Sequence, residues 1–192
     1  MTSHPQRHYT LDDYFMVEAT STIRHEYCDG QIFAMAGASV AHNDIAANVL
    51  SALRLGLRGS GCRAFGNDLR IATANDLFTY PDVSVVCGEP VLVPDRPDTV
   101  TNPVLLVEVL SDATRDYDRG EKLAAYQGIT TLREVLLVDQ HSVSVERWYR
   151  GTEGSWSFED WRSLDAEVLI RAAPARLAIA EIYREVFAAP TS

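Results

Sequence analysis

The sequence predicts a mixed α/β (α+β) domain in which a largely antiparallel sheet is flanked by helices. Short apolar runs recur along the chain and are separated by turn residues, without the regular strand-helix alternation of a doubly wound fold. One long early helix and one middle helix stand among these strands. No GxGxxG or GxxxxGK[ST] loop is present, so the sequence contains no nucleotide-phosphate loop.

Size and charge limit the classes of function. With 192 residues, 46% of them hydrophobic, the chain is long enough for a single domain with its own core, and we expect one domain over residues 1–192. The formal net charge of −10 excludes a chain that is basic overall. Nucleic-acid binding would therefore depend on local cationic positions or on a bound cation.

The lack of targeting signals and the cysteine usage both favour a location in the cytoplasm. No apolar run approaches the ~18 residues of a membrane span, and the N-terminus has no apolar signal segment, so we expect no membrane partner. Cys28, Cys62 and Cys87 are widely spaced and form no CxxC pair. We expect them to be unpaired and to act as small hydrophobic residues in a reducing compartment.

The first third of the chain predicts a helix, a hairpin and a longer helix. Thr10 followed by Asp13 is a weak capping signature for a short helix over Thr10–Glu18. Asp29-Gly30, inside "RHEYCDGQIFAM", is a strong hairpin signal. A long helix follows Ser39 as N-cap and ends at Gly59 or Gly61, and its apolar stripe is Ile45, Val49, Ala52, Leu53 and Leu57.

The remaining elements are mainly strands. We expect strands at 62–66, 68–73 and 82–87, a loop at 88–102, and a buried strand at 104–110. A helix of about Asp116–Gln127 follows, with Gly128 behind it. Strands at 134–140 and 142–149, a turn at 151–156 and an amphipathic helix over 176–187 complete the prediction.

Two strands each carry an unexpected acid. Glu108 interrupts the apolar run "VLLVEVL", although a buried carboxylate without partners costs several kcal/mol. Asp82 opens "DVSVVC" after Pro81. If the two strands are antiparallel neighbours, the two carboxylates face each other and repel unless a cation lies between them. Mg²⁺ suits such a site, and Lys122 on the next helix could stabilise developing negative charge beside it.

Four stretches together resemble the Uma2 family of bacterial proteins, formerly a domain of unknown function. They are "RHEYCDGQIFAMAGASVAHNDIAANV", "YPDVSVVC", "NPVLLVEVLSDATRDYDRGEKLAAY" and "LREVLLVDQ". The resemblance runs from about residue 24 to 187, which would be the core of the domain. That family belongs with the PD-(D/E)XK restriction-endonuclease-like fold.

The resemblance implies a Mg²⁺-dependent endonuclease acting on DNA, with Mn²⁺ as a substitute metal. Asp82 and Glu108 would be the metal ligands. The superfamily's lysine should stand two residues after the second acid, but Leu110 occupies that position, and Lys122 is its candidate replacement. Glu26 and His42 would complete the site.

Enzymes of this fold often work as dimers, so we also expect a homodimer. The apolar positions of the last predicted helix could supply the dimer face or pack in the core: Leu177, Ile179, Ile182, Tyr183 and Phe187.

Simpler interpretations remain open for each candidate. Asp82 could be a polar residue at a strand start, and Glu108 could form a structural salt bridge with Arg70 or Arg115. Lys122 could form a surface ion pair with Asp118, worth ~0.3–0.5 kcal/mol.

His42 could be a core histidine, and Glu26 a solvated strand residue. For the whole chain, the alternatives are a binding or regulatory module with a weak metal site, or hydrolysis of RNA or a small phosphodiester.

Overall fold

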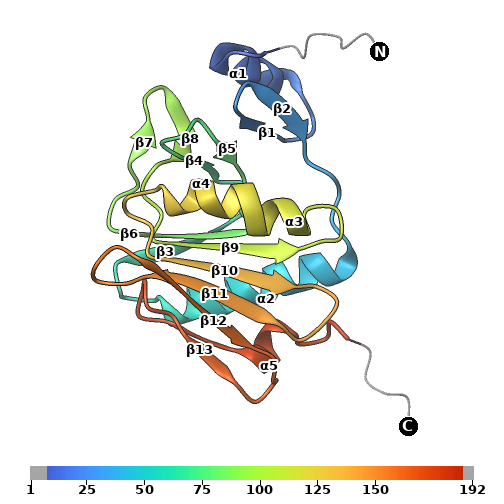
Figure 1. The fold of residues 1–192 in the computed structure, drawn as a ribbon, viewed down its shortest axis with the longest axis vertical. Helices are drawn as coiled ribbons and strands as arrows, with labels where there is room; N and C mark the ends of the chain where they lie inside the picture. Colours follow the sequence, from blue (N-terminus) through green and yellow to red (C-terminus); the bar gives the residue numbers. More distant parts are fainter. Residues whose placement is uncertain (1–7, 188–192) are drawn as a thin grey trace.

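The computed structural model describes residues 8–187 and has an α+β architecture. Its described strands form two six-stranded sheets and one two-stranded sheet. Sheet A has the order β2-β1-β5-β4-β8-β7, and sheet B has the order β12-β11-β10-β9-β6-β3 (Figure 1). The two-stranded sheet pairs β13 with β14.

Sheet A contains β1 (His25–Cys28), β2 (Gln31–Ala34), β4 (Arg70–Ala72), β5 (Phe78–Thr79), β7 (Leu92–Val93) and β8 (Arg96–Val100). Sheet B contains β3 (Cys62–Gly66), β6 (Val83–Cys87), β9 (Leu105–Leu110), β10 (Glu134–Asp139), β11 (Val145–Arg150) and β12 (Trp156–Trp161). The small sheet contains β13 (Glu167–Leu169) and β14 (Arg176–Ala178). The helical elements are α1 (Leu11–Thr20), α2 (Val40–Gly56), α3 (Arg115–Tyr117), the π-helical turn η1 (Asp118–Lys122), α4 (Leu123–Gln127) and α5 (Ile179–Ile182).

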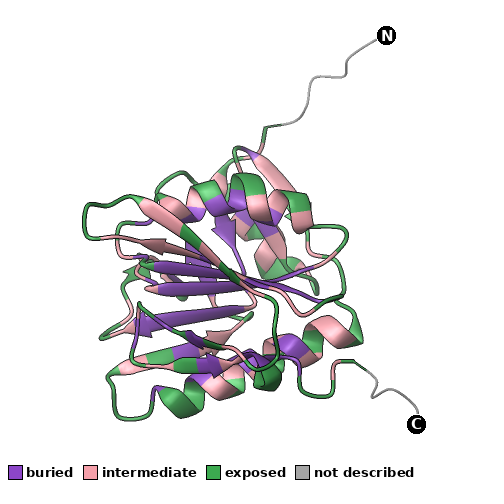
Figure 2. Cartoon of the chain, turned by 60° about the horizontal axis from the view of Figure 1, so that its bottom comes forward, coloured by how far each residue is buried: buried purple, intermediate pink, exposed green. Residues whose placement is uncertain are grey.

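The predicted mixed, mostly antiparallel arrangement is confirmed. Within sheet B only β9 and β10 are parallel, and the other neighbours are antiparallel. Helix α2 lies against one face of this sheet, and the α3–η1–α4 segment lies on the other face (Figure 1). The central strands are therefore buried on both faces, as Figure 2 shows.

Helix α2 forms where the sequence predicts it. The Ser39 side chain accepts a hydrogen bond from the His42 N–H, which satisfies one of the free donors at the helix start. Ile45, Val49 and Leu53 of the predicted stripe are fully buried against sheet B, and each contributes about 1.5–3 kcal/mol. The helix ends at Gly56, earlier than the predicted glycines.

Two further local predictions are confirmed. Thr10 caps α1 and forms a reciprocal capping box with Asp13. Asp29 and Gly30 both have positive φ, 45° and 76°, as a two-residue hairpin turn requires, and they join β1 to β2.

Two element predictions are wrong. The segment 88–102 is not a plain loop, because it contains the β7–β8 hairpin. Pro90, Pro94 and Pro97 concealed these short strands at the border of sheet A, since proline argues against a strand except at an edge.

The predicted C-terminal helix is also wrong for most of its length. Its first residues form β14, and only Ile179–Ile182 is α-helical. Leu177, Ile179, Ile182 and Tyr183 pack in the core, whereas Phe187 is 41% exposed, so the expected core packing holds for four of the five apolar positions.

The cysteine prediction is wrong as well. Cys62 and Cys87 form a disulfide, and Cys28 is the free cysteine of the described residues. The register of β3 against β6 places these two residues directly opposite each other. Their separation of 25 residues along the chain hid this proximity.

Among residues 8–187, none of the helices has both the length and the apolar character that crossing a membrane requires.

Candidate metal-dependent active site

Strands β6 and β9 bring the two predicted acids together. They are antiparallel, and Val83 pairs with Val107. One step further in the same register, Asp82 stands opposite Glu108. Asp82 Oδ2 also accepts a hydrogen bond from the Val109 N–H at 2.7 Å, which fixes its carboxylate at the end of β9. The antiparallel pairing on which the prediction depended is therefore present.

Glu108 lies inside the apolar layer between sheet B and the helix above it. It is 4% exposed, and its neighbours on β9 are all buried. Lys122 Nζ lies 3.0 Å from Glu108 Oε1, and the Tyr126 hydroxyl donates a hydrogen bond to the same oxygen. The expected alternative pairings fail, because Arg70 binds Glu18 and Asp98, while Arg115 binds Asp112 and Asp139.

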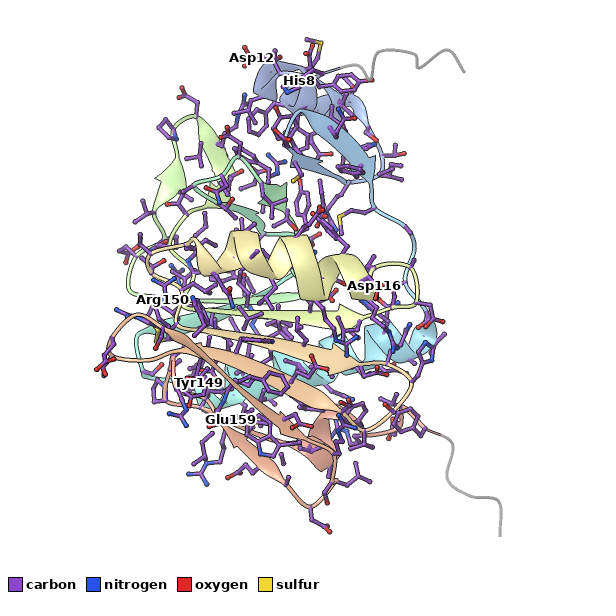
Figure 3. All side chains as sticks on the ribbon, viewed as in Figure 1. His8, Asp12, Asp116, Tyr149, Arg150 and Glu159 are labelled. Atoms are coloured by element: carbon purple, nitrogen blue, oxygen red, sulfur yellow. A yellow bond between two sulfur atoms is a disulfide. The ribbon has the colours of Figure 1, made fainter. Side chains whose placement is uncertain are left out.

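A π-helical turn carries Lys122 into this position. The predicted helix is divided into α3, η1 and α4, and η1 covers Asp118–Lys122 (Figure 3, beside the labelled Asp116). Such turns widen a helix locally and are frequent at functional sites. Lys122 Nζ lies 3.5 Å from Asp118 Oδ1, so the predicted ion pair exists. Both side chains are buried, however, so the pair is not a surface one.

Glu26 joins the site from sheet A. It lies on β1, and its Oε1 is 3.1 Å from Lys122 Nζ. The Thr79 hydroxyl of the neighbouring strand β5 donates a hydrogen bond to the same oxygen. Glu26 is 9% exposed and therefore is not a solvated strand residue. Lys122 thus links the two large sheets through their carboxylates.

His42 approaches from the first turn of α2. Its Nε2 lies 3.3 Å from Asp82 Oδ2. Burial lowers the pKa of His42, but the hydrogen bond and charge of Asp82, together with the charge of Asp118, outweigh that effect and raise the pKa. Its Nδ1 is buried without a hydrogen-bond partner in the described part of the chain. A hydrogen bond with the Val109 backbone also raises the pKa of His42, so the ring has a backbone partner although its Nδ1 has none.

These side chains form what we call the carboxylate centre: Glu26, Asp82, Glu108 and Asp118 around Lys122, with His42 at its border. Three carboxyl groups thus share Lys122, and a fourth, Asp82, contacts His42, so the ionised carboxylates would exceed the cations even if His42 is protonated. Buried carboxylates of this kind must be neutralised by protons or by a cation.

The pKa values reflect this excess. Burial is the largest cause that raises the pKa of Glu108, to about 8, and the charges of Asp118 and Asp82 add to the rise while Lys122 opposes it. Burial also raises the pKa of Asp118. The pKa of Lys122 is raised well above its usual value, because the neighbouring carboxylates outweigh the effect of its burial.

The donor chemistry fits a hard divalent cation. Within residues 8–187, no three His, Cys, Asp or Glu side chains are arranged as a ready metal cage. Mg²⁺ usually needs only one or two protein carboxylates, because waters and substrate phosphate supply its remaining ligands. Asp82 and Glu108, opposite each other on adjacent strands, provide that pair. The unpartnered His42 Nδ1 and Tyr117 hydroxyl are buried polar atoms that a hydrated ion or substrate could satisfy.

Tyr117 and Tyr126, beside the centre, escaped prediction, and Asp118 was expected only as a surface partner of Lys122. Asp118, Lys122 and Tyr126 are four residues apart in sequence, a spacing that places side chains on one helix face. This periodicity could have revealed Asp118 and Tyr126. Nothing in the sequence indicated Tyr117, whose position depends on the π-helical turn.

Comparisons with known proteins agree on the family. The profile of the Uma2 family, described as "Putative restriction endonuclease", matches residues 11–179. The Synechocystis sp. protein slr1290 is 34% identical over 176 residues, which cover 90% of each chain. A second protein of that organism, sll1609, is 32% identical over 160 residues, 83% of this chain and 90% of its own length.

A crystal structure from Anabaena variabilis, described as "a putative nuclease belonging to DUF820", has the same fold. Its TM-score is 0.75 at 19% identity, and the match covers 93% of this chain and 99% of that one. The family profile spans most of the chain, and two relatives exceed 30% identity. This chain belongs to the Uma2 family.

Proposed function

We propose that this protein is a Mg²⁺-dependent endonuclease of the PD-(D/E)XK type that hydrolyses phosphodiester bonds in DNA. The observation that carries the proposal is the carboxylate centre, where three buried carboxyl groups share Lys122 and the half-buried Asp82, just before β6, is held against the end of β9. The family description and the fold of the Anabaena nuclease support the same class of reaction.

Each side chain has a role that follows from its contacts. Asp82 and Glu108 would hold the cation, with Mn²⁺ as a substitute for Mg²⁺. A divalent cation there would supply Lewis acidity toward the scissile phosphate and the attacking water. If a cation replaced Lys122 as the partner of Glu108, the Lys122 ammonium group would donate hydrogen bonds to the phosphate oxygens as negative charge develops on them.

His42 and Glu26 would handle protons and position groups. His42 is hydrogen-bonded to Asp82, and its free Nδ1 can accept or donate a proton. Glu26 holds Lys122 from the opposite side and so orients its ammonium group. In this proposal the enzyme acts as a homodimer, so that two centres address the two DNA strands.

The test is cleavage of labelled duplex and single-stranded DNA with EDTA, Mg²⁺ or Mn²⁺. The wild type should cleave only with metal, and Asp82→Asn should lose turnover. Asp165→Asn, which changes an exposed acid outside the centre, is the matched control and should keep full activity. Absence of metal-dependent cleavage of every DNA and RNA substrate by the wild type would contradict the proposal. Size-exclusion chromatography with light scattering tests the dimer.

One observation favours a second function, a binding or regulatory module with a weak metal site. The centre is enclosed, because the side chains of Asp82 and Glu108 are only 12% and 6% exposed. A duplex cannot reach them without movement of the covering elements. Cleavage and binding separate the two functions, since a binding module should retain its partner in the Asp82→Asn variant.

A further inference from the structure

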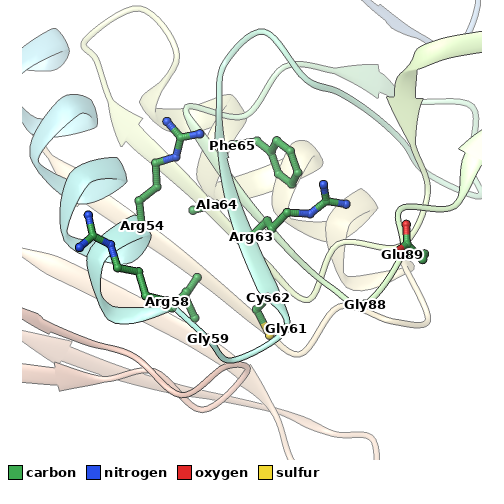
Figure 4. Close-up of a pocket in the computed structure, with 11 residues that line it drawn as sticks. Arg54, Arg58, Gly59, Gly61, Cys62, Arg63, Ala64, Phe65, Gly88 and Glu89 are labelled. Carbon is green, nitrogen blue, oxygen red and sulfur yellow. The ribbon is translucent and has the colours of Figure 1, made fainter.

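A second candidate site lies at the far end of α2, away from the carboxylate centre. A pocket of about 690 Å³ opens where α2 ends and β3 begins. Arg54 borders it from the end of α2, Arg58 from the turn that follows, and Arg63 and Phe65 from β3 (Figure 4). Its volume falls within the range of ligand pockets, about 300–1,000 Å³.

The three arginines have no carboxylate partner. Within residues 8–187, none of them lies within ion-pair distance of an acidic side chain, whereas Arg119 and Arg147 are paired. Arg96, Arg133 and Arg150 also have no such partner among these residues, but they do not line the pocket. Glu89 is the acidic residue among those that line the pocket. Three arginines without an ion-pair partner thus surround the edge strand β3, Arg54 and Arg58 on one side of it and Arg63 on the other (Figure 4), in a chain whose net charge is −10.

Ordinary structural roles account for these arginines only one at a time. Arg54 complements the negative end of the α2 dipole, and a charge such as Arg63 discourages edge-to-edge pairing of β3. Neither role requires arginines from two different elements to border the same pocket. Guanidinium groups match phosphate oxygens in geometry and charge, which explains the combination.

The backbone of the pocket is open to a ligand. Gly59 and Gly61 have positive φ, 75° and 80°, and no atom lies within 4 Å of the position where either would carry a Cβ. Phe65 is half-buried, and the Arg63 guanidinium lies over its ring at 5.5 Å. An aromatic face beside cationic groups also suits a stacked base.

We propose that this pocket binds a ligand carrying more than one phosphate group, either the backbone of a nucleic acid or a free polyphosphate. For a nucleic-acid ligand the inference rests on the proposed function and extends it. Arg54 stands twelve residues after His42 on α2, which is about 18 Å along the helix. A single strand that follows α2 covers this length in about five nucleotides. The pocket would provide a local cationic binding site for a polyanion on a protein that is acidic overall.

The test is fluorescence anisotropy with a labelled single-stranded oligonucleotide in EDTA, where no metal-dependent turnover occurs. The variant replaces all three arginines, Arg54→Gln, Arg58→Gln and Arg63→Gln. The matched control replaces three exposed arginines elsewhere, Arg162→Gln, Arg176→Gln and Arg184→Gln, and so removes the same charge. Circular dichroism checks that both variants are folded.

We expect the pocket variant to bind the oligonucleotide at least about tenfold more weakly than the wild type. The slope of log K against log salt should also become smaller by about 2. The control variant should keep the affinity and slope of the wild type, apart from the small effect that the lost net charge has on both variants. Competition by inorganic tripolyphosphate separates the sources. Displacement of the oligonucleotide at comparable phosphate concentration indicates a free polyphosphate ligand, and resistance indicates a nucleic-acid backbone.

Equal weakening in the two variants, or no binding of either probe by the wild type, would overturn the inference. Because the measurement is made without metal, its failure leaves the cleavage assay unaffected.

Discussion

The excess of carboxylates in the centre makes an unusual prediction about Glu108→Gln. Glutamine has the shape of the protonated acid and carries no charge. Because burial raises the pKa of Glu108 from 4.5 to about 8, the folded protein holds a proton that the unfolded chain has already lost. The wild type therefore loses stability as pH rises from about 4.5 to about 8, whereas the variant lacks this contribution.

The size of this difference in stability follows from the shift in the pKa of Glu108. Each pH unit within that interval corresponds to about 1.4 kcal/mol of unfolding free energy. Glu108→Gln should therefore exceed the wild type by roughly 3 kcal/mol at pH 7 and by somewhat more at pH 8, in EDTA. For a chain of this length, 3 kcal/mol raises the melting temperature by about 6–12 °C.

Urea unfolding at pH 6, 7 and 8 measures the effect, first in EDTA and then with Mg²⁺. Metal should narrow the difference, because a ligand at 100 times its Kd stabilises the folded wild type by about 2.7 kcal/mol and the variant by less. Glu153→Gln, an exposed acid in a turn, is the control and should show neither effect. If Glu108→Gln were less stable than the wild type at pH 8 in EDTA, Glu108 would be an ionised partner of Lys122, and the reasoning from its raised pKa would be refuted.

Three further predictions concern stability. Lys122→Met should cost about 3–5 kcal/mol at pH 8 in EDTA, because it leaves buried carboxylates without their cation, and Mg²⁺ should restore part of the loss in urea unfolding. Reduction of the Cys62–Cys87 disulfide should lower stability by about 3–4 kcal/mol for a loop of this length, and a Cys62→Ala, Cys87→Ala variant should not respond to reductant. Ser39→Ala should cost about 1 kcal/mol through loss of the α2 cap, and an unchanged urea midpoint would contradict that role.

Local signals in the sequence predicted the elements that local chemistry determines. The Ser39 and Thr10 caps mark helix starts because their hydroxyls satisfy free backbone donors, and Asp29-Gly30 marks the hairpin because both residues tolerate positive φ. The acid in the middle of the apolar strand pointed to the centre, because a carboxylate survives there only with a partner.

Features that depend on long-range packing were not predictable in this way. The Cys62–Cys87 pair depends on the register of β3 against β6, and β14 depends on pairing with β13. The apolar periodicity of residues 116–127 did not indicate that a π-helical turn divides the middle helix. That turn places Asp118 and Tyr117 against the centre, so the sequence predicted Lys122 without the residues around it.

The π-helical turn also makes the geometry of the centre depend on the number of residues between Tyr117 and Lys122. In an α-helix each residue rotates the following side chains by about 100°, so one residue more or fewer between Tyr117 and Lys122 would turn Lys122 and Tyr126 away together. The segment therefore tolerates changes of residue type more readily than changes of length. We therefore expect an insertion or deletion in this stretch to disrupt the site, because the spacing after Glu108 positions the side chains that the stretch carries.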